Sequence, residues 1–137
     1  YHKTLGKLLY DYCGLARNEE GLKYAIEEIR KLKQEFYQNV TIPGVGDKMN
    51  GELEKAGRVA DYFEIGELMC YDALTRNESC GAHFREEYQT PDGEALRNDA
   101  DFQFISAWGW KGEEQEPELV KEPLVFEEIQ PVVRSYK

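Results

Sequence analysis

The sequence lacks several features that assign proteins to common classes. Its 137 residues contain no run of about 18 apolar residues, which a helix needs to cross a bilayer, so direct membrane insertion is not expected. The three cysteines, Cys13, Cys70 and Cys80, are far apart and form no CxxC pair. Neither a zinc site nor a disulfide framework is therefore indicated, and a reducing compartment is the simpler expectation.

Positive charge is scarce as well. The 17 Lys and Arg face 27 Asp and Glu, giving a net charge of −10, and residues 111–128 alone carry seven Glu against two Lys. This excess argues against nucleic acid or an anionic membrane as the main partner. The chain also lacks an initiator methionine and opens at Tyr1 in helical spacing. We expect a fragment of a longer protein, the alternative being a mature chain after removal of a leader.

Apolar residues at helical spacing predict two helices in the first part of the chain. The apolar face of the first consists of Leu5, Leu8, Leu9 and Tyr12. Gly14 is expected to end it in the left-handed conformation. Asn18 is expected to cap the second helix, which continues to about Gln38 with an apolar stripe of Leu22, Ile26, Ile29, Leu32 and Phe36.

A third helix is predicted from about Gly51 to Arg76, capped by Asp47 or Asn50. Its apolar residues cover much of its girth, which is typical of a helix packed on two sides. Gly57 and Gly66 are unfavourable inside a helix unless another helix approaches closely. The sequence therefore predicts a mainly α fold, with residues 1–76 forming an antiparallel three-helix bundle similar to a spectrin repeat.

Residues 77–137 have a different pattern, which predicts an extended strap and then a small β-hairpin. Residues 83–88 are expected to be extended, and the Pro91-Asp92-Gly93 turn follows. Period-two aromatic residues indicate one strand: Phe102, Phe104, Trp108 and Trp110. Residues 124–126 are expected to form its partner. Because a lone hairpin is marginally stable, we expect it to lie on the bundle or on another domain.

Residues 76–87, RNESCGAHFREE, concentrate the groups that could support chemistry. Cys80 and His83 are three residues apart, which suits a nucleophile–base pair or two metal ligands. No third histidine, CxxC pair or glycine-rich nucleophile turn accompanies them, so both hypotheses are disfavoured. No GxGxxG dinucleotide motif is present either.

Arginines in and near this segment could bind a carboxylate substrate, because guanidinium pairs bidentately with carboxylates. The three candidates are Arg76, Arg85 and Arg97. Acidic residues stand beside them, namely Glu78, Glu86 and Glu87. Mutual salt bridges that hold an irregular segment on the helices are the favoured interpretation.

The order of these segments resembles the C-terminal domain of the flavoprotein subunit of succinate dehydrogenase and fumarate reductase. The resemblance rests on LARNEEGLKYAIEEIRKLKQEF and then ELMCYDALTRNESCGAHFREEY. The family pattern is Arg, any residue, Glu-Ser-Arg-Gly-Ala-His, any residue, Arg and an acid. Arg97-Asn98-Asp99 also resembles a later Arg-Asp-Asp of the family. Cys80 departs from the pattern, because it replaces the usual Arg.

The resemblance implies a parent enzyme that interconverts succinate and fumarate on FAD and passes electrons through an iron–sulfur subunit to a quinone. It implies a location in the cytoplasm, peripheral on the inner face of the membrane through partner subunits. The family's covalent flavin site and its catalytic Arg lie in other domains, so no catalytic, cofactor-binding or metal residue is expected within residues 1–137. The flavin domain of the same chain is the expected neighbour.

What the resemblance assigns to this chain is a supporting role. We name six residues the strap motif: Arg76, Glu78, Ser79, Gly81, His83 and Arg85. Its charged groups are expected to hydrogen-bond to backbone and to one another, Gly81 to adopt a backbone geometry closed to other residues, and His83 to be a buried hydrogen-bonding group. The surface that meets the flavin domain is expected to form an apolar patch larger than a monomer normally exposes, or to be covered by a second copy of the chain. Two alternatives remain: the equivalent domain of aspartate oxidase, and a free-standing acidic helical interaction module.

Overall fold

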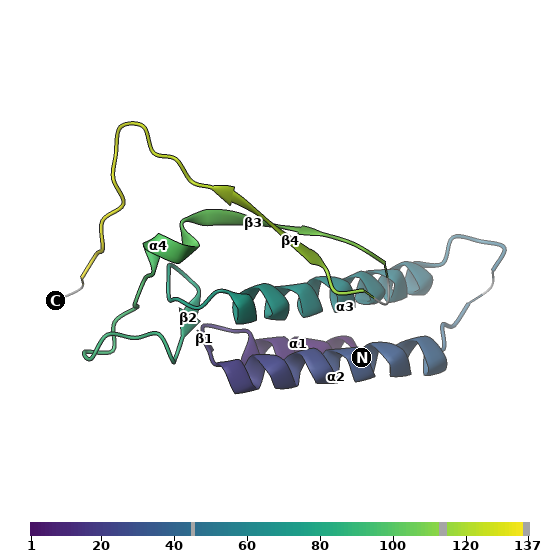
Figure 1. Cartoon of the computed structure of the whole chain (residues 1–137). Coiled ribbons are helices and arrows are strands. Elements are labelled where there is room, and N and C mark those ends of the chain that lie inside the picture. Colours follow the sequence, from purple (N-terminus) through teal and green to yellow (C-terminus); the bar gives the residue numbers. More distant parts are fainter. Residues whose placement is uncertain (45, 113–114, 136–137) are drawn as a thin grey trace.

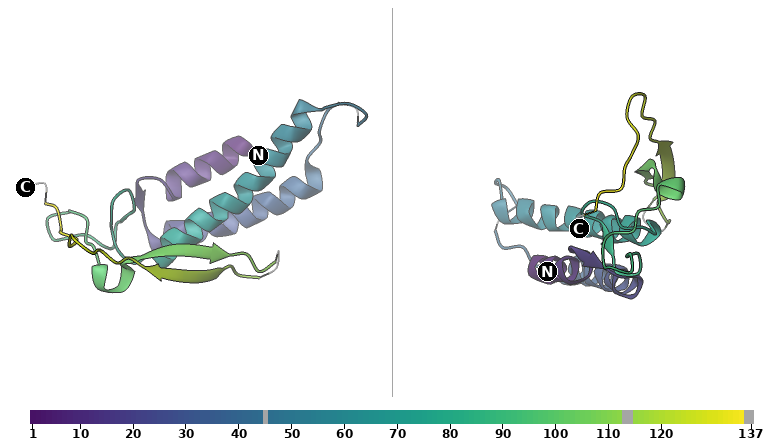
Figure 2. Two further views of the ribbon diagram at one scale, coloured as in Figure 1. Left: turned by 90° about the horizontal axis from the view of Figure 1, so that it is seen from above. Right: turned by 90° about the vertical axis from the view of Figure 1, so that its left-hand side faces the viewer.

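The computed structural model describes residues 1–44, 46–112 and 115–135, which are mainly helical with a small amount of sheet (Figure 1). The elements are α1 (His2–Tyr12), β1 (Ala16–Arg17), α2 (Glu19–Asn39), α3 (Gly51–Thr75), β2 (Phe84–Arg85), α4 (Asp99–Phe102), β3 (Phe104–Gly109) and β4 (Glu118–Pro123). The three long helices lie side by side, and successive helices run in opposite directions (Figures 1 and 2). No helix among the described residues is both long and apolar enough to span a bilayer.

The three long helices share one apolar core. Its buried residues are Leu5, Cys13, Leu22, Ala25, Ile26, Ile29, Phe36, Phe63, Cys70 and Ala73. They recur every three or four positions along α2 and α3, so each helix turns one face toward its neighbours. Phe36 and Phe63 meet within this core, with ring centroids 5.4 Å apart. The three helices predicted from the apolar spacing are confirmed.

Asparagine side chains cap the two longest helices, as the sequence predicts. Asn18 Oδ1 accepts the N–H of Gly21 at 2.8 Å. Asn50, rather than Asp47, caps α3, since its Oδ1 accepts the N–H groups of Glu52 and Leu53. These bonds satisfy N–H groups that have no partner inside a helix.

One expectation about glycines is wrong, and another is met at one of its two positions. Gly14 is not left-handed, since it is absent from the residues with positive φ. α1 ends at Tyr12, and its C-cap residue, Cys13, has φ −121°. Glycine is needed there for another reason: a Cβ would lie 2.5 Å from the carbonyl oxygen of Tyr10. Gly66 does sit at a close helix contact, where a Cβ would be 3.1 Å from Leu9 Cδ1, but Gly57 has open space around it.

The predicted hairpin is present, but its second strand is β4, not residues 124–126. The antiparallel register pairs Phe104 with Pro123 and Trp108 with Leu119, so residues 124–126 follow the strand. Of the period-two aromatic residues, only Phe104 and Trp108 lie in β3. Phe102 belongs to α4, and Trp110 follows the strand with 76% of its surface exposed.

The hairpin lies over the C-terminal end of α3 (Figure 1), and in the view from above the two diverge toward the tip of the hairpin (Figure 2). Trp108 fixes it there, since its Nε1–H donates to Asp72 Oδ1 at 2.8 Å and its ring meets Tyr71 edge to face.

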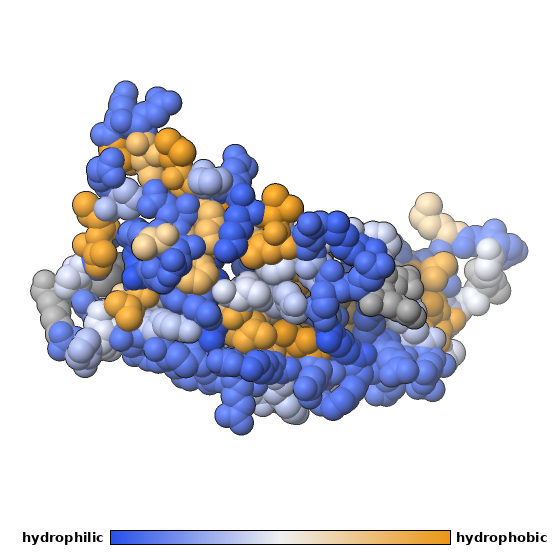
Figure 3. Space-filling model, in the orientation of Figure 1, coloured by the Kyte–Doolittle hydropathy of each residue, from blue (hydrophilic) through white to orange (hydrophobic). Residues whose placement is uncertain are grey.

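Beyond β4 the chain loops away from the helices (Figure 1). Residues 124–133 there expose apolar side chains: Leu124, Val125, Phe126, Ile129, Val132 and Val133. Figure 3 shows hydrophobic residues along the hairpin and this tail, whereas the edge formed by α2 is hydrophilic.

The extended segment expected at 83–88 is shorter in the structure, where only β2 is a strand. β2 pairs in parallel with β1, which the sequence did not predict, through Ala16↔Phe84 and Arg17↔Arg85. A two-residue strand has too few residues to show a period-two pattern. This pairing brings segment 76–87 to the end of the bundle where α3 ends and α2 begins (Figure 1).

Candidate functional site

Arg85 is the most deeply buried charged residue described, with 1% of its surface exposed. Its Nη1 donates to the carbonyl oxygens of Ala73 at 2.9 Å and Leu74 at 3.2 Å, in the last turn of α3. Those carbonyls have no partner within the helix, and the helix dipole places partial negative charge there. α3 has no basic residue in its own last turn, so Arg85 supplies the missing cation from β2.

The backbone of Arg85 is fixed by Ser79, which is fully buried. The N–H of Arg85 donates to Ser79 Oγ at 2.8 Å, and the Ser79 hydroxyl donates to the Arg85 carbonyl at 3.1 Å. The N–H of Ser79 donates to the Leu96 carbonyl at 2.8 Å. A serine hydroxyl can donate and accept at once, so the Ser79 side chain alone makes two hydrogen bonds to the backbone of Arg85.

Glu87 joins Arg85 to the beginning of α2. Its Oε2 accepts from Arg85 Nε at 3.0 Å, and its Oε1 accepts the N–H of Glu19 in the first turn of α2. Burial alone would raise the pKa of Glu87, but the Glu19 N–H and the Arg85 guanidinium lower it overall. A cation therefore lies at the C-terminal end of α3 and an anion at the N-terminal end of α2, and both positions are favoured by the helix dipoles.

Glu78 links segment 76–87 to the chain that follows it. It is 3% exposed, and its Oε1 accepts from Arg76 Nη1 at 2.8 Å while its Oε2 accepts the N–H of Asn98 at 2.9 Å. Arg76 also donates to the carbonyls of Phe102 and Phe104, and its guanidinium lies over both rings. Glu78 and Arg76 thereby anchor α4 and the start of β3 at the end of α3.

His83 is half-buried and hydrogen-bonded through both ring nitrogens. Arg17 Nη1 lies 3.0 Å from Nδ1, and the Arg76 carbonyl lies 2.9 Å from Nε2. Because arginine only donates and a carbonyl only accepts, Nδ1 must accept and Nε2–H must donate. The ring is therefore neutral. Burial lowers the pKa of His83, and the charges of Arg17 and neighbouring arginines act in the same direction.

This neutral His83 predicts a loss of stability in mild acid. Its pKa is lower in the folded than in the unfolded chain, so the unfolded chain binds the extra proton first. The contribution of neutral His83 to the free energy of unfolding is fully present above the pKa of the unfolded chain, about 6.5. It falls as the pH drops below that value, with a slope of at most about 1.4 kcal/mol per pH unit. Urea unfolding between pH 7.5 and 5 should show this decline in the native protein but not in His83→Gln. Parallel curves for the two proteins would contradict it.

Cys80 and Gly81 form an exposed turn beside His83. Backbone hydrogen bonds link Cys80 and His83 in both directions, and Gly81 has φ +60°, in the left-handed region. The Cys80 side chain is exposed, whereas both nitrogens of His83 bond to Arg17 and Arg76. The described contacts therefore form no Cys80–His83 nucleophile–base pair.

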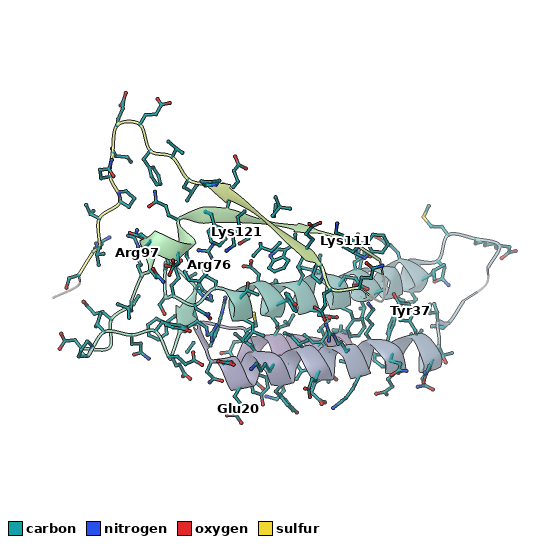
Figure 4. The ribbon with its side chains drawn as sticks, in the orientation of Figure 1. Glu20, Tyr37, Arg76, Arg97, Lys111 and Lys121 are labelled. Atoms are coloured by element: carbon teal, nitrogen blue, oxygen red, sulfur yellow. The ribbon has the colours of Figure 1, made fainter. Side chains whose placement is uncertain are left out.

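The three arginines considered for a carboxylate substrate each pair with an acid of the same chain. Arg76 pairs with Glu78 and Arg85 with Glu87, as described above. Arg97 makes a bidentate pair with Asp99, with Nη2 at 2.7 and 2.8 Å from the two oxygens, and donates to the Val132 carbonyl. Figure 4 shows Arg76 and Arg97 near α4, beyond the end of α3. Within the described ranges, no buried side-chain nitrogen or oxygen lacks a partner.

Two residues complete these contacts although no pattern in the sequence singled them out: Arg17 and Asp72. Each acts across a long sequence separation, as Arg17 does on His83. Periodicity and capping rules describe neighbours three or four positions apart, so they carry no signal for such pairs. No cluster of three or more His, Cys, Asp or Glu side chains suited to a metal ion occurs in the part of the chain that the structure describes.

The chain is similar in sequence to a protein family and to several known proteins. A family model described as fumarate reductase flavoprotein C-term matches residues 2–136. An FAD-dependent oxidoreductase of Methanocaldococcus jannaschii, itself uncharacterized, is 36% identical over 92 residues, which cover 63% of this chain and 15% of that protein. The fumarate reductase flavoprotein subunit of Proteus vulgaris is 28% identical over 98 residues, covering 72% of this chain and 16% of that protein.

A solved structure has a similar fold. FrdA of Escherichia coli quinol fumarate reductase, solved as a mutant, matches with a TM-score of 0.77 and 22% identity. The match covers 93% of this chain and 21% of FrdA. The chain thus spans roughly a fifth or less of the length of these relatives, at 15%, 16% and 21%.

Proposed function

The chain belongs to the fumarate reductase flavoprotein C-terminal family, and on this premise we propose that it is the accessory C-terminal domain of an FAD-dependent succinate dehydrogenase or fumarate reductase. The parent family is one of oxidoreductases, and relatives are named as an FAD-dependent oxidoreductase and as a fumarate reductase flavoprotein subunit. The parent would interconvert succinate and fumarate. These relatives favour this assignment over aspartate oxidase and over a free-standing interaction module.

In this proposal the domain supports the fold of the parent and holds no catalytic residue. The observation that carries it is the burial of Arg85 between the carbonyls that end α3 and Glu87 at the start of α2. A side chain that is 1% exposed offers almost no surface to a substrate, and truncating it would leave buried acceptors unpaired. The strap motif connects the two parts of the proposed domain. Residues 1–76 form the antiparallel bundle, and residues 77–137 form the strap and the hairpin tail.

FAD belongs to another part of the parent protein in this proposal. The sequence contains no GxGxxG loop for a pyrophosphate, and the charged groups of the strap motif are engaged with one another or with backbone. These residues do not fit a flavin site. The flavin domain of the same chain is the proposed neighbour, with an iron–sulfur subunit and a membrane quinone beyond it and a peripheral position on the inner face of the membrane.

The exposed turn at Cys80 and Gly81 and the apolar tail at 124–133 are the surfaces we propose for contact with the flavin domain. Both project from the helices, and the tail exposes apolar side chains, such as Val125 at 82%. Apolar patches that a monomer leaves uncovered commonly mark interaction sites. The family pattern has Arg where this chain has Cys80, and that Arg would project toward the flavin domain.

The test is a flavin and turnover measurement on two proteins: this chain, and the product of the complete reading frame that encodes it. We expect the longer protein to carry covalent FAD and to oxidise succinate, and this chain alone to do neither. A longer product that oxidises L-aspartate instead would favour the aspartate oxidase alternative. Absence of flavin from the longer product would overturn the family-based function and leave the interaction module.

A further inference from the structure

The β3–β4 hairpin leaves one edge of β3 open. Its sheet has two strands among the described residues. In an antiparallel pair, residues that bond the partner strand alternate with residues whose backbone groups point away from it. The Leu124 N–H donates to the Gln103 carbonyl, which fixes this alternation in the register that pairs Phe104 with Pro123. Three residues of β3 therefore turn their N–H and C=O groups away from β4: Phe104, Ser106 and Trp108.

Arg76 occupies only the beginning of this outer edge of β3. Its Nη2 donates to the Phe104 carbonyl at 3.1 Å. Within the described part of the chain, no hydrogen bond from outside the hairpin reaches the backbone of Ser106 or Trp108. A row of alternating N–H and C=O groups matches the backbone of another extended strand, whereas a helix uses its own groups internally.

The two strands of the hairpin differ in how their edges are protected. Native proteins commonly place charged residues and proline on a strand edge, because these disfavour the addition of another strand. β4, ELVKEP, contains Lys121 and Pro123, and the register turns the backbone of both away from β3. β3, FISAWG, has neither a charged residue nor a proline. The edge of β3 is therefore the one suited to receive a strand.

An apolar face of α3 adjoins this edge. Tyr62, Ile65 and Met69 recur at three and four positions, and each is about half exposed. Asp72, which accepts from Trp108, is the next residue on the same face, and Ile65 lines the same cavity as Trp108. A strand that pairs with β3 would lie beside Ile65 and Met69 and bury apolar side chains that the chain alone leaves in water.

We propose that β3 pairs with an extended strand supplied by the rest of the parent protein, which makes a three-stranded sheet over α3. The chain spans 15%, 16% and 21% of the length of its relatives, so most of the proposed parent lies outside it. A second copy of this chain suits the edge less well, because each copy carries a net charge of −10 and the two would repel each other.

The chemistry of the strand follows from its two faces. Alternate side chains point to opposite faces of a sheet, so every second residue of the strand faces α3 and must be apolar to cover Ile65 and Met69. Its backbone supplies the carbonyls and N–H groups that Ser106 and Trp108 lack. The inference rests on the proposed function in one respect, that the chain is part of a longer protein.

The experiment measures hydrogen–deuterium exchange of single amides in this chain and in the product of the complete reading frame. We expect the Ser106 and Trp108 amides to exchange at least about tenfold more slowly in the longer protein, because their N–H groups then donate to a partner strand. The Ile105 and Ala107 amides are the internal control, since they point to β4 and should be slow in both proteins.

Two results of this comparison would overturn the proposal. Fast exchange of Ser106 and Trp108 in both proteins would show that no strand pairs with the edge. Slow exchange in this chain alone, strengthening as its concentration rises, would show that a second copy occupies the edge instead.

Ser106→Pro separates strand pairing from simple burial. Proline removes the outward N–H but no bond between β3 and β4, and it is tolerated where the N–H of an edge strand points away from its sheet. In the longer protein we expect the Trp108 amide of this variant to exchange roughly tenfold faster. Unchanged exchange would show that burial without pairing protects it, which overturns the proposal. Ala107→Pro is the matched control, because it removes an N–H that points to β4 and should loosen the hairpin in both proteins.

The result is independent of the flavin and turnover measurement on the same longer protein. A product that oxidises succinate but exchanges both amides fast keeps the proposed function and overturns this inference. A product without flavin that protects both amides overturns the proposed function and keeps the strand pairing.

Discussion

Arg85→Ala should lower the free energy of unfolding by about 3 kcal/mol, the scale seen when one partner of a buried ion pair is removed. The loss has three parts in the structure. The carbonyls of Ala73 and Leu74 lose their donor, Glu87 loses its cation, and a space remains where a side chain 1% exposed was packed. Buried acceptors that lose their donor are the costly part.

Urea unfolding followed by circular dichroism measures this loss, and Arg85→Lys is the matched control. Lysine keeps the charge but replaces the planar fork with a single ammonium, so it cannot bond the helix carbonyls and Glu87 with the same geometry. We expect an intermediate loss for lysine. If alanine leaves the urea midpoint unchanged, Arg85 is not buried in solution, and the structural role of the strap motif fails.

Glu78→Ala should have the second-largest effect, a loss of roughly 2–3 kcal/mol. Glu78 is 3% exposed and accepts from Arg76 and from the N–H of Asn98. Without it, the guanidinium of Arg76 keeps its charge close to the rings of Phe102 and Phe104 with no anion beside it. The turn before α4 loses its anchor as well.

Glu78→Gln is the matched control, because it keeps the shape and one acceptor but removes the charge. We expect it to lose less than alanine. A double-mutant cycle with Arg76→Ala isolates the pair, and a coupling free energy near zero would show that Glu78 acts through Asn98 alone. Tryptophan fluorescence gives a second reading, since Trp108 packs on α3 and should become more exposed if the hairpin loosens.

Much of the helical part could be predicted from the sequence, because it depends on near neighbours. The apolar residues of α2 and α3 recur at three and four positions, and Asn18 and Asn50 cap their helices through N–H groups two or three residues ahead. These interactions lie within one helical turn, so a sequence displays them directly. Gly14 is the exception, since its glycine serves a close approach to Tyr10 rather than a left-handed turn.

The hairpin was predicted in kind but not in register. β4 contains Glu118, Lys121 and Glu122 with few apolar residues, and the more apolar residues 124–126 looked the better strand. In the structure the register pairs Phe104 with Pro123 and Trp108 with Leu119. β propensity alone did not identify this second strand, because propensity depends strongly on the context of a strand.

The sequence by itself determined the three helices, their capped starts and the resemblance of segment 76–87 to a known family. Only the tertiary structure decided what that segment does within the chain: that Arg85 donates to a carbonyl in the last turn of α3, and that Glu87 accepts an N–H in the first turn of α2. The physical reason is distance along the chain. Helix formation and capping depend on neighbours within a turn, whereas the burial of a charge depends on partners that folding brings together.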